Sequence, residues 1–166
     1  MNCYDTFMST PTHLLVGASI AKAAALMGAP VASEHILAIA MIAAVAPDID
    51  ILVYGYGTKH HASILHKPVI WAGLFSVAYA ANAVFALPYA NVLSIAAIGV
   101  LSHFILDTGN YSQGVQWLWP FSDNVLHFFK LAKRPDSLKQ RWQVFSRHPA
   151  FAAEALIWIG AIVFLF

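Results

Sequence analysis

The sequence contains few charged residues and a single cysteine. Only 10% of its 166 residues are charged, whereas soluble domains contain about 25%. Cys3 is the only cysteine, which excludes an intramolecular disulfide and a thiolate metal cluster. The net charge of +1 gives no bias that would indicate nucleic-acid binding. The N-terminus lacks the basic stretch and apolar run of a cleaved signal peptide, and there is no internal repeat.

Apolar residues, in contrast, are abundant. They make up 60% of the chain, and the mean hydropathy is +0.67. A chain of this length cannot bury so much apolar surface in one core, but a lipid environment removes the conflict. We therefore predict an all-α fold, a polytopic membrane bundle of about five transmembrane helices that forms one domain over residues 1–166. Five apolar stretches lie near the ~17–25 residues that a spanning helix needs. They run from Thr12 to Gly28, His35 to Tyr54, Pro68 to Leu87, Tyr89 to Leu106 and Pro149 to Phe166.

The basic residues predict an orientation in the membrane. Eight of the nine lie in two connections, Gly55–Lys67 and Asp107–His148. Short loops rich in Lys and Arg stay in the cytoplasm, and five alternating spans put both connections on that side. The N-terminus is then cytoplasmic and the C-terminus lies outside. Within the long basic loop at about residues 107–148, Lys130–Arg147 reads equally well as an amphipathic surface helix or as a solvated loop.

This orientation gathers histidines and aspartates at the cytoplasmic ends of separate spans. Each residue alone has an ordinary explanation, such as an interfacial histidine or the end of a helix. Two ionisable groups near the end of an apolar span are costly unless they are paired or functional, and the combination favours a metal site. The residues are His13, Asp48, Asp50, His61, His66, His103 and Asp107.

The spacing of these residues suits a site built from imidazoles and carboxylates, which are ligands for zinc, manganese or iron. His103 and Asp107 are four apart, on one face of a helix. Pro47 interrupts helical hydrogen bonding, so Asp48 and Asp50 are free of helical spacing. His61 and His66 fit a loop that leads into a helix. Lys22 and Glu154 lie inside apolar spans, where they pair with each other or extend toward the interface.

Several of these residues belong to short motifs that occur in a specific order. The motifs resemble the bacterial inner-membrane family of predicted metal-dependent hydrolases, which includes a LexA-regulated protein. The resemblance covers about Pro11 to Ser122 and implies a divalent metal cofactor. The family is distantly similar to zinc-dependent phospholipase C. The motifs are the stretch from Thr12 to Gly17, Pro47-Asp48-Ile49-Asp50, His61 to His66, His103 to Asp107, and Trp119 to Ser122.

One departure from the family pattern concerns the substrate. The family commonly has Arg after the first histidine of the pair and Thr or Ser near the second, and here Ala62 and Leu65 take those places, although Ser63 is close. If that Arg contacts an anionic substrate, this chain uses another cation, such as Lys59 or Lys67, or its substrate differs.

The leading hypothesis is a metal-dependent hydrolase at the cytoplasmic face of the inner membrane, acting on a phosphoester or phospholipid-like substrate. A divalent ion, with zinc preferred, would be held by His13, His61, His66, His103 and Asp107, while Asp48 and Asp50 act as ligands or as the catalytic base. A metal-binding membrane protein or transporter without hydrolysis is the alternative. Transporters usually hold ions near the bilayer midplane, whereas these residues lie at span ends. A third alternative is a membrane protein that uses a metal for stability alone.

Overall fold

The chain folds into a bundle of helices. The computed structural model describes residues 10–29, 33–54, 62–109, 114–129, 143–144 and 146–166. Within these ranges there is no strand, and a single isolated bridge joins Val115 and Leu126. The prediction of an all-α fold is therefore confirmed. The helices are α1 (Thr10–Leu26), α2 (Ser33–Val45), η1 (Ala46–Asp50), α3 (Ile51–Tyr54), η2 (Ile64–His66), α5 (Pro68–Val84), α6 (Ala90–Thr108) and α8 (Pro149–Leu165).

Two segments are long and apolar enough to cross a membrane. They are Glu34–Tyr54, which joins α2 to α3, and Ala90–Thr108, which is α6. The helices α5 and α8 are also apolar but have only 17 residues each. The structure thus supports membrane insertion and leaves the number of five spans as a prediction.

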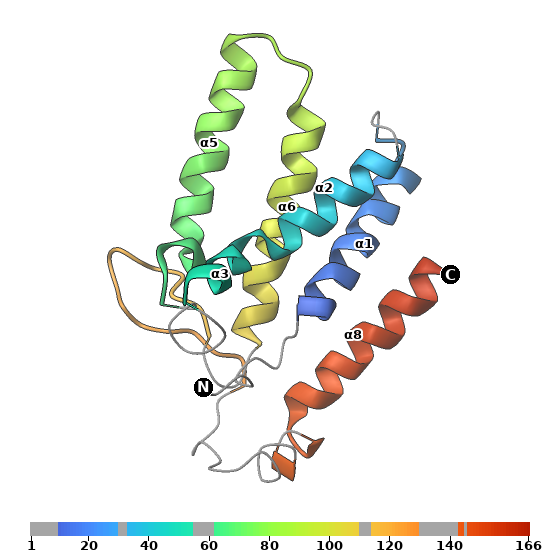
Figure 1. Cartoon of the computed structure of the whole chain (residues 1–166), viewed down its shortest axis with the longest axis vertical. Helices are drawn as coiled ribbons and strands as arrows, with labels where there is room; N and C mark the ends of the chain where they lie inside the picture. The colour runs from blue at the N-terminus through green and yellow to red at the C-terminus, as the bar shows by residue number, and fades with distance from the viewer. Residues whose placement is uncertain (1–9, 30–32, 55–61, 110–113, 130–142, 145) are drawn as a thin grey trace.

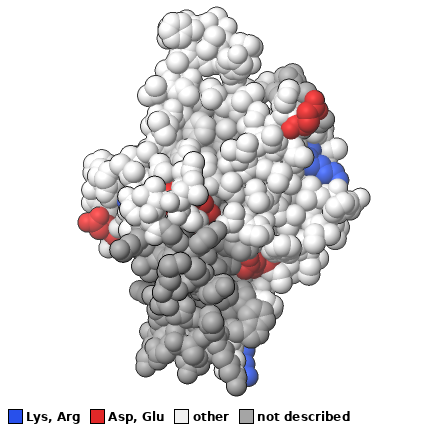
Figure 2. Space-filling model, in the orientation of Figure 1, with Lys and Arg blue, Asp and Glu red and all other residues white. Residues whose placement is uncertain are grey.

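The outer surface of the helices suits lipid. Large apolar side chains such as Leu74 and Val77 on α5 and Ile159 and Val163 on α8 are exposed. Charged side chains are sparse over the upper part of the face shown in Figure 2. In water, apolar exposure on this scale would favour association, whereas acyl chains can cover it.

Small residues let the helices pack closely. α2 lies against both α1 and α6. A Cβ added to Gly17 of α1 would lie 2.8 Å from Met41 Cα, and one added to Gly99 of α6 would lie 2.9 Å from Ala43 Cβ. Both would also come within 3.1 Å of the Ala40 carbonyl oxygen. Glycine and alanine at such contacts are typical of helices packed within membranes.

Successive helices run in opposite directions, and this brings several helix ends together. In Figure 1 the start of α1, the α2–α3 junction, the start of α5 and the end of α6 meet in the lower part of the molecule, as predicted. These are the ends that carry the predicted histidines and aspartates.

The last helix, α8, packs along α1. Near one end the Thr12 hydroxyl donates to Glu154 Oε1 at 2.6 Å and accepts from Trp158 Nε1 at 3.0 Å. Near the other end Lys22 Nζ donates to the Leu165 carbonyl oxygen at 2.9 Å. Lys22 and Glu154 thus each contact a partner across the α1–α8 interface, at separate points along it.

Candidate metal centre

The helix α6 supplies two of the side chains at the meeting point. His103 and Asp107 lie one turn apart, and His103 Nε2 is 3.2 Å from Asp107 Oδ2. Their neighbour Phe104 packs edge-on against the His103 imidazole, with ring centroids 5.7 Å apart. The predicted helical pairing of His103 and Asp107 is therefore present, and both side chains are buried.

Pro47 shapes the segment that carries the two other aspartates. Because proline cannot donate a helical hydrogen bond, α2 gives way to the tighter turn η1 at this point. Asp48 Oδ1 lies 3.6 Å from His103 Nε2 and 3.4 Å from His66 Nε2. Asp50 contacts the other nitrogen of His66, with 3.0 Å between Oδ2 and Nδ1.

His66 ends the short turn η2, just before α5 begins at Pro68. Its imidazole lies between the aspartates of η1 and the polar residues of α6. The Nε2 atom is 3.7 Å from Asp107 Oδ2 and 3.4 Å from His103 Nε2. The prediction that His66 lies where a loop enters a helix is confirmed.

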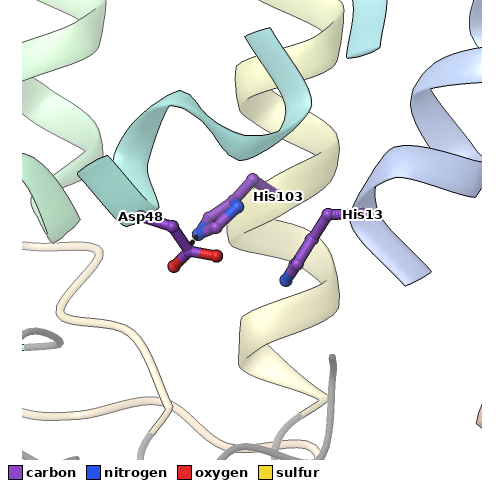
Figure 3. Close-up of side chains that lie close together, drawn as sticks. All are labelled: His13, Asp48 and His103. Carbon is purple, nitrogen blue, oxygen red and sulfur yellow. Dashed lines mark ion pairs between the residues drawn. The ribbon is translucent and has the colours of Figure 1, made fainter. Parts of the chain in front are cut away.

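His13 comes from the first turns of α1. Its ring stacks on that of His103, with centroids 4.1 Å apart and planes inclined by 22°. Its Nε2 lies 3.3 Å from Asp107 Oδ1, whereas His103 contacts the other oxygen, Oδ2. Figure 3 shows His13 and His103 side by side, with Asp48 beside them.

The two imidazoles of His66 and His103 both turn Nε2 toward the centre of this group. His103 Nδ1 lies 2.9 Å from the Ala44 carbonyl oxygen, which can only accept, so Nδ1 carries the proton. The Asp50 carboxylate takes the same role toward His66. In the neutral rings both Nε2 atoms then present lone pairs, and they face each other and the oxygens of Asp48 and Asp107. Acceptors grouped in this way favour a shared positive charge, either a proton or a metal ion.

The distances among three of these atoms match those among the ligands of one zinc ion. His66 Nε2, His103 Nε2 and Asp107 Oδ2 lie 3.2–3.7 Å from one another, and Asp48 Oδ1 lies 3.4–3.6 Å from the two Nε2 atoms. Ligand atoms ~2.0–2.2 Å from a tetrahedral zinc ion are ~3.3–3.6 Å from one another. The donor set therefore fits zinc in both chemistry and spacing.

The electrostatics favour positive charge at the same place. Burial lowers the pKa of His66, but its contacts with Asp48 and Asp50 outweigh that effect and raise the pKa to about 9. The neighbourhood that stabilises a proton on His66 also stabilises a cation bound in its place.

The structure thus brings together six of the seven predicted residues. His61 lies outside the described residues. Asp50 lies behind His66 and does not share the centre, and the Ser63 hydroxyl also donates to it. Sequence reasoning missed the Ala44 carbonyl, because a backbone group leaves no trace in residue identity. Pro47, three residues later, was the available signal, since proline disturbs the hydrogen bonding of the preceding turn.

Comparison with known protein families shows the family to which this chain belongs. The model of the YdjM inner membrane protein family matches residues 8–166, nearly the whole chain. The chain belongs to this family. No curated protein and no solved structure matches it. Membership of the YdjM family agrees with the predicted inner-membrane location and with the apolar helices α2 and α6. The family description names no reaction, so the similarity to zinc-dependent phospholipase C stays a prediction.

Proposed function

We propose that this YdjM-family protein is a metal-dependent hydrolase at the cytoplasmic face of the inner membrane, with zinc as the preferred ion. The observation that carries the proposal is the convergence of His66 Nε2, His103 Nε2 and Asp107 Oδ2 at the spacing of zinc ligands, with Asp48 Oδ1 beside the two imidazoles.

His66, His103 and Asp107 are the proposed ligands. Three protein ligands are typical of catalytic zinc sites, which also bind a water or the substrate. These three side chains are at most 2% exposed. Asp50 and the Ala44 carbonyl orient the two imidazoles from behind, as outer partners do in known metal sites.

Asp48 is the proposed catalytic base. Its side chain is 13% exposed, so it borders both the buried ligands and the outside of the site. A bound divalent ion would supply the Lewis acidity that activates water for attack on a phosphoester. Asp48 would accept the proton of that water, since its Oδ1 lies beside both ligating imidazoles. His13 would hold Asp107 in position through the 3.3 Å contact between its Nε2 and Asp107 Oδ1.

The proposed substrate is a phosphoester at the membrane surface, with a phospholipid headgroup as the preferred example. The centre lies at the ends of apolar helices. In a five-span arrangement with a cytoplasmic N-terminus, these ends would lie at the depth of the headgroups. A distant relation to zinc-dependent phospholipase C would agree with this chemistry, but by analogy alone.

The burial of His66, His103 and Asp107 also favours a second function. If Asp48 is a fourth ligand, the site is closed, as in zinc sites that stabilise a protein without chemistry. The chain would then be a metal-binding membrane protein, and an ion carrier remains part of this alternative.

The test combines metal analysis with hydrolysis assays on the purified full-length protein. We expect about one zinc ion per chain and hydrolysis of a phosphodiester or phospholipid that Asp48→Asn abolishes while zinc is retained. Zinc binding without hydrolysis, with zinc lost in Asp48→Asn, would support the closed site. Protein that binds no divalent ion would overturn both.

A further inference from the structure

A groove of about 460 Å³ lies between α5 and α6, beside the candidate metal centre. It follows the first two turns of α5, from Pro68 to Phe75, and the last turns of α6, from Ala97 to Phe104. Its volume is within the ~300–1,000 Å³ of typical small-molecule sites. Phe104 separates it from the metal centre, because one side of the ring meets the groove and His103 packs against it from another side.

The walls of this groove are apolar and held in place. Trp71 donates its Nε1–H to the Leu65 carbonyl oxygen at 2.7 Å, and Trp117 donates to the Thr108 hydroxyl at 2.8 Å. Both indoles therefore point their polar edges into the protein, and both line the groove. Small side chains such as Ala72 and Ala97 leave the space between them open. A groove with fixed walls costs a ligand little to enter, since few side chains must be reordered.

A buried basic residue adjoins the groove where α5 begins. Lys67 directly precedes Pro68, which lines the groove, and it is only 7% exposed. Its ammonium donates to the Gln116 side-chain oxygen, next to Trp117. An ammonium has three donors, of which the Gln116 side-chain oxygen accepts from one, and the charge of Asp123 acts on Lys67 from nearby. A phosphate oxygen would accept from another of these donors.

We propose that the groove binds one acyl chain of an anionic phospholipid, with its phosphate at Lys67. The ligand and the groove have matching polarity: a cation lies at the end where α5 begins, and apolar side chains line the two turns that follow. The groove extends roughly 11 Å along α5, at 1.5 Å per residue, so it holds part of a chain while the rest stays in the bilayer. This binding does not depend on a metal ion.

The test measures lipid bound to the purified full-length protein by native mass spectrometry, with phosphatidylglycerol and phosphatidylcholine as probes. The wild type should bind one phosphatidylglycerol in preference to phosphatidylcholine. Ala97→Leu and Ala72→Leu fill the groove from its two walls and should each lose this binding. Lys67→Gln should reduce the preference for phosphatidylglycerol about tenfold, the size expected for one hydrogen bond to a charged group.

Ala23→Leu is the matched control. Ala23 lines a separate apolar groove of about 290 Å³ between α1 and α6, together with Asn91 and Ser94 near the start of α6. This variant should bind phosphatidylglycerol like the wild type. Removal of metal with a chelator should also leave binding unchanged, which separates this proposal from the proposed hydrolysis. Equal binding by all folded variants, or full competition by glycerol phosphate without acyl chains, would overturn the lipid groove.

Discussion

Asp50 lies behind His66, with 3.0 Å between its Oδ2 and the Nδ1 of the imidazole, on the side of the ring away from Asp48. This contact sets the orientation of Nε2 toward the centre without placing Asp50 there. We expect Asp50→Ala to weaken zinc binding by ~10–100-fold, the range for partners that orient a ligand. In Asp50→Asn the amide oxygen can still accept the hydrogen bond from His66 Nδ1, so this variant should lose less zinc affinity than Asp50→Ala. Competition with a chelator measures both, and an unchanged affinity in Asp50→Ala would exclude the orienting role.

Asp107 contacts three histidines, with its oxygens 3.2–3.7 Å from His13, His66 and His103. Asp107→Asn keeps the shape of the side chain and removes its charge. If Asp107 is a ligand, this substitution should weaken zinc binding by more than the ~10–100-fold expected for a residue that only orients a ligand. His103→Ala should weaken zinc binding at least as much. Bound metal per folded protein and thermal stability should be measured together. Normal metal content with lowered stability would make the pair a buried polar contact only.

Zinc binding should depend on pH through His66. The pKa of His66 is raised to about 9, so the imidazole carries a proton at neutral pH in the metal-free protein. This proton contributes stability that is fully present below about pH 6.5 and is lost as the pH rises through 9. A metal ion needs the neutral ring. Zinc affinity should therefore increase from pH 6.5 to 9, by up to about tenfold per pH unit for one proton displaced. Titration calorimetry in buffers of different ionisation enthalpy counts the protons released, and a count of zero would contradict this linkage.

The glycines that bring α1 and α6 against α2 should tolerate no side chain. Gly17→Ala would place a Cβ 2.8 Å from the backbone of Met41, and Gly99→Ala would place one 2.9 Å from Ala43 Cβ. Overpacking of this kind costs about 1–3 kcal/mol. Gly160→Ala on α8 is the control, because its Cβ would meet nothing within 4 Å. Thermal unfolding in detergent compares the three, and equal stability would mean that the helices can move apart at no cost.

The orientation in the membrane can be tested with reporter fusions. A five-span chain with a cytoplasmic N-terminus places Lys130–Arg147 in the cytoplasm and Phe166 outside. Fusions at these two places should therefore report opposite sides. A fusion at Leu87, between α5 and α6, should agree with the one at Phe166. Reports from the same side for Phe166 and the basic loop would reject five spans.

The sequence by itself determined the helices and the end of the bundle at which the polar residues gather. Long apolar runs must form helices in lipid, because every backbone group needs an internal partner there. The predicted run from Pro68 begins where α5 begins, and the run from Pro149 ends one residue beyond α8. Alternating helix directions then place His13, Asp48, His66 and Asp107 at one end, whatever the details of packing.

The tertiary structure alone decided which atoms face the centre. Asp48 and Asp50 are two residues apart and indistinguishable by pattern, yet one faces both Nε2 atoms and the other lies behind His66. The sequence pattern also did not indicate three other features: the role of the Ala44 carbonyl, the Thr12–Glu154 contact and the groove beside Trp71. Hydropathy and spacing specify the direction of a side chain to about one helix face. Ligand geometry depends instead on tenths of an ångström, which are set by how α1, α2 and α6 pack through Gly17, Ala40 and Gly99.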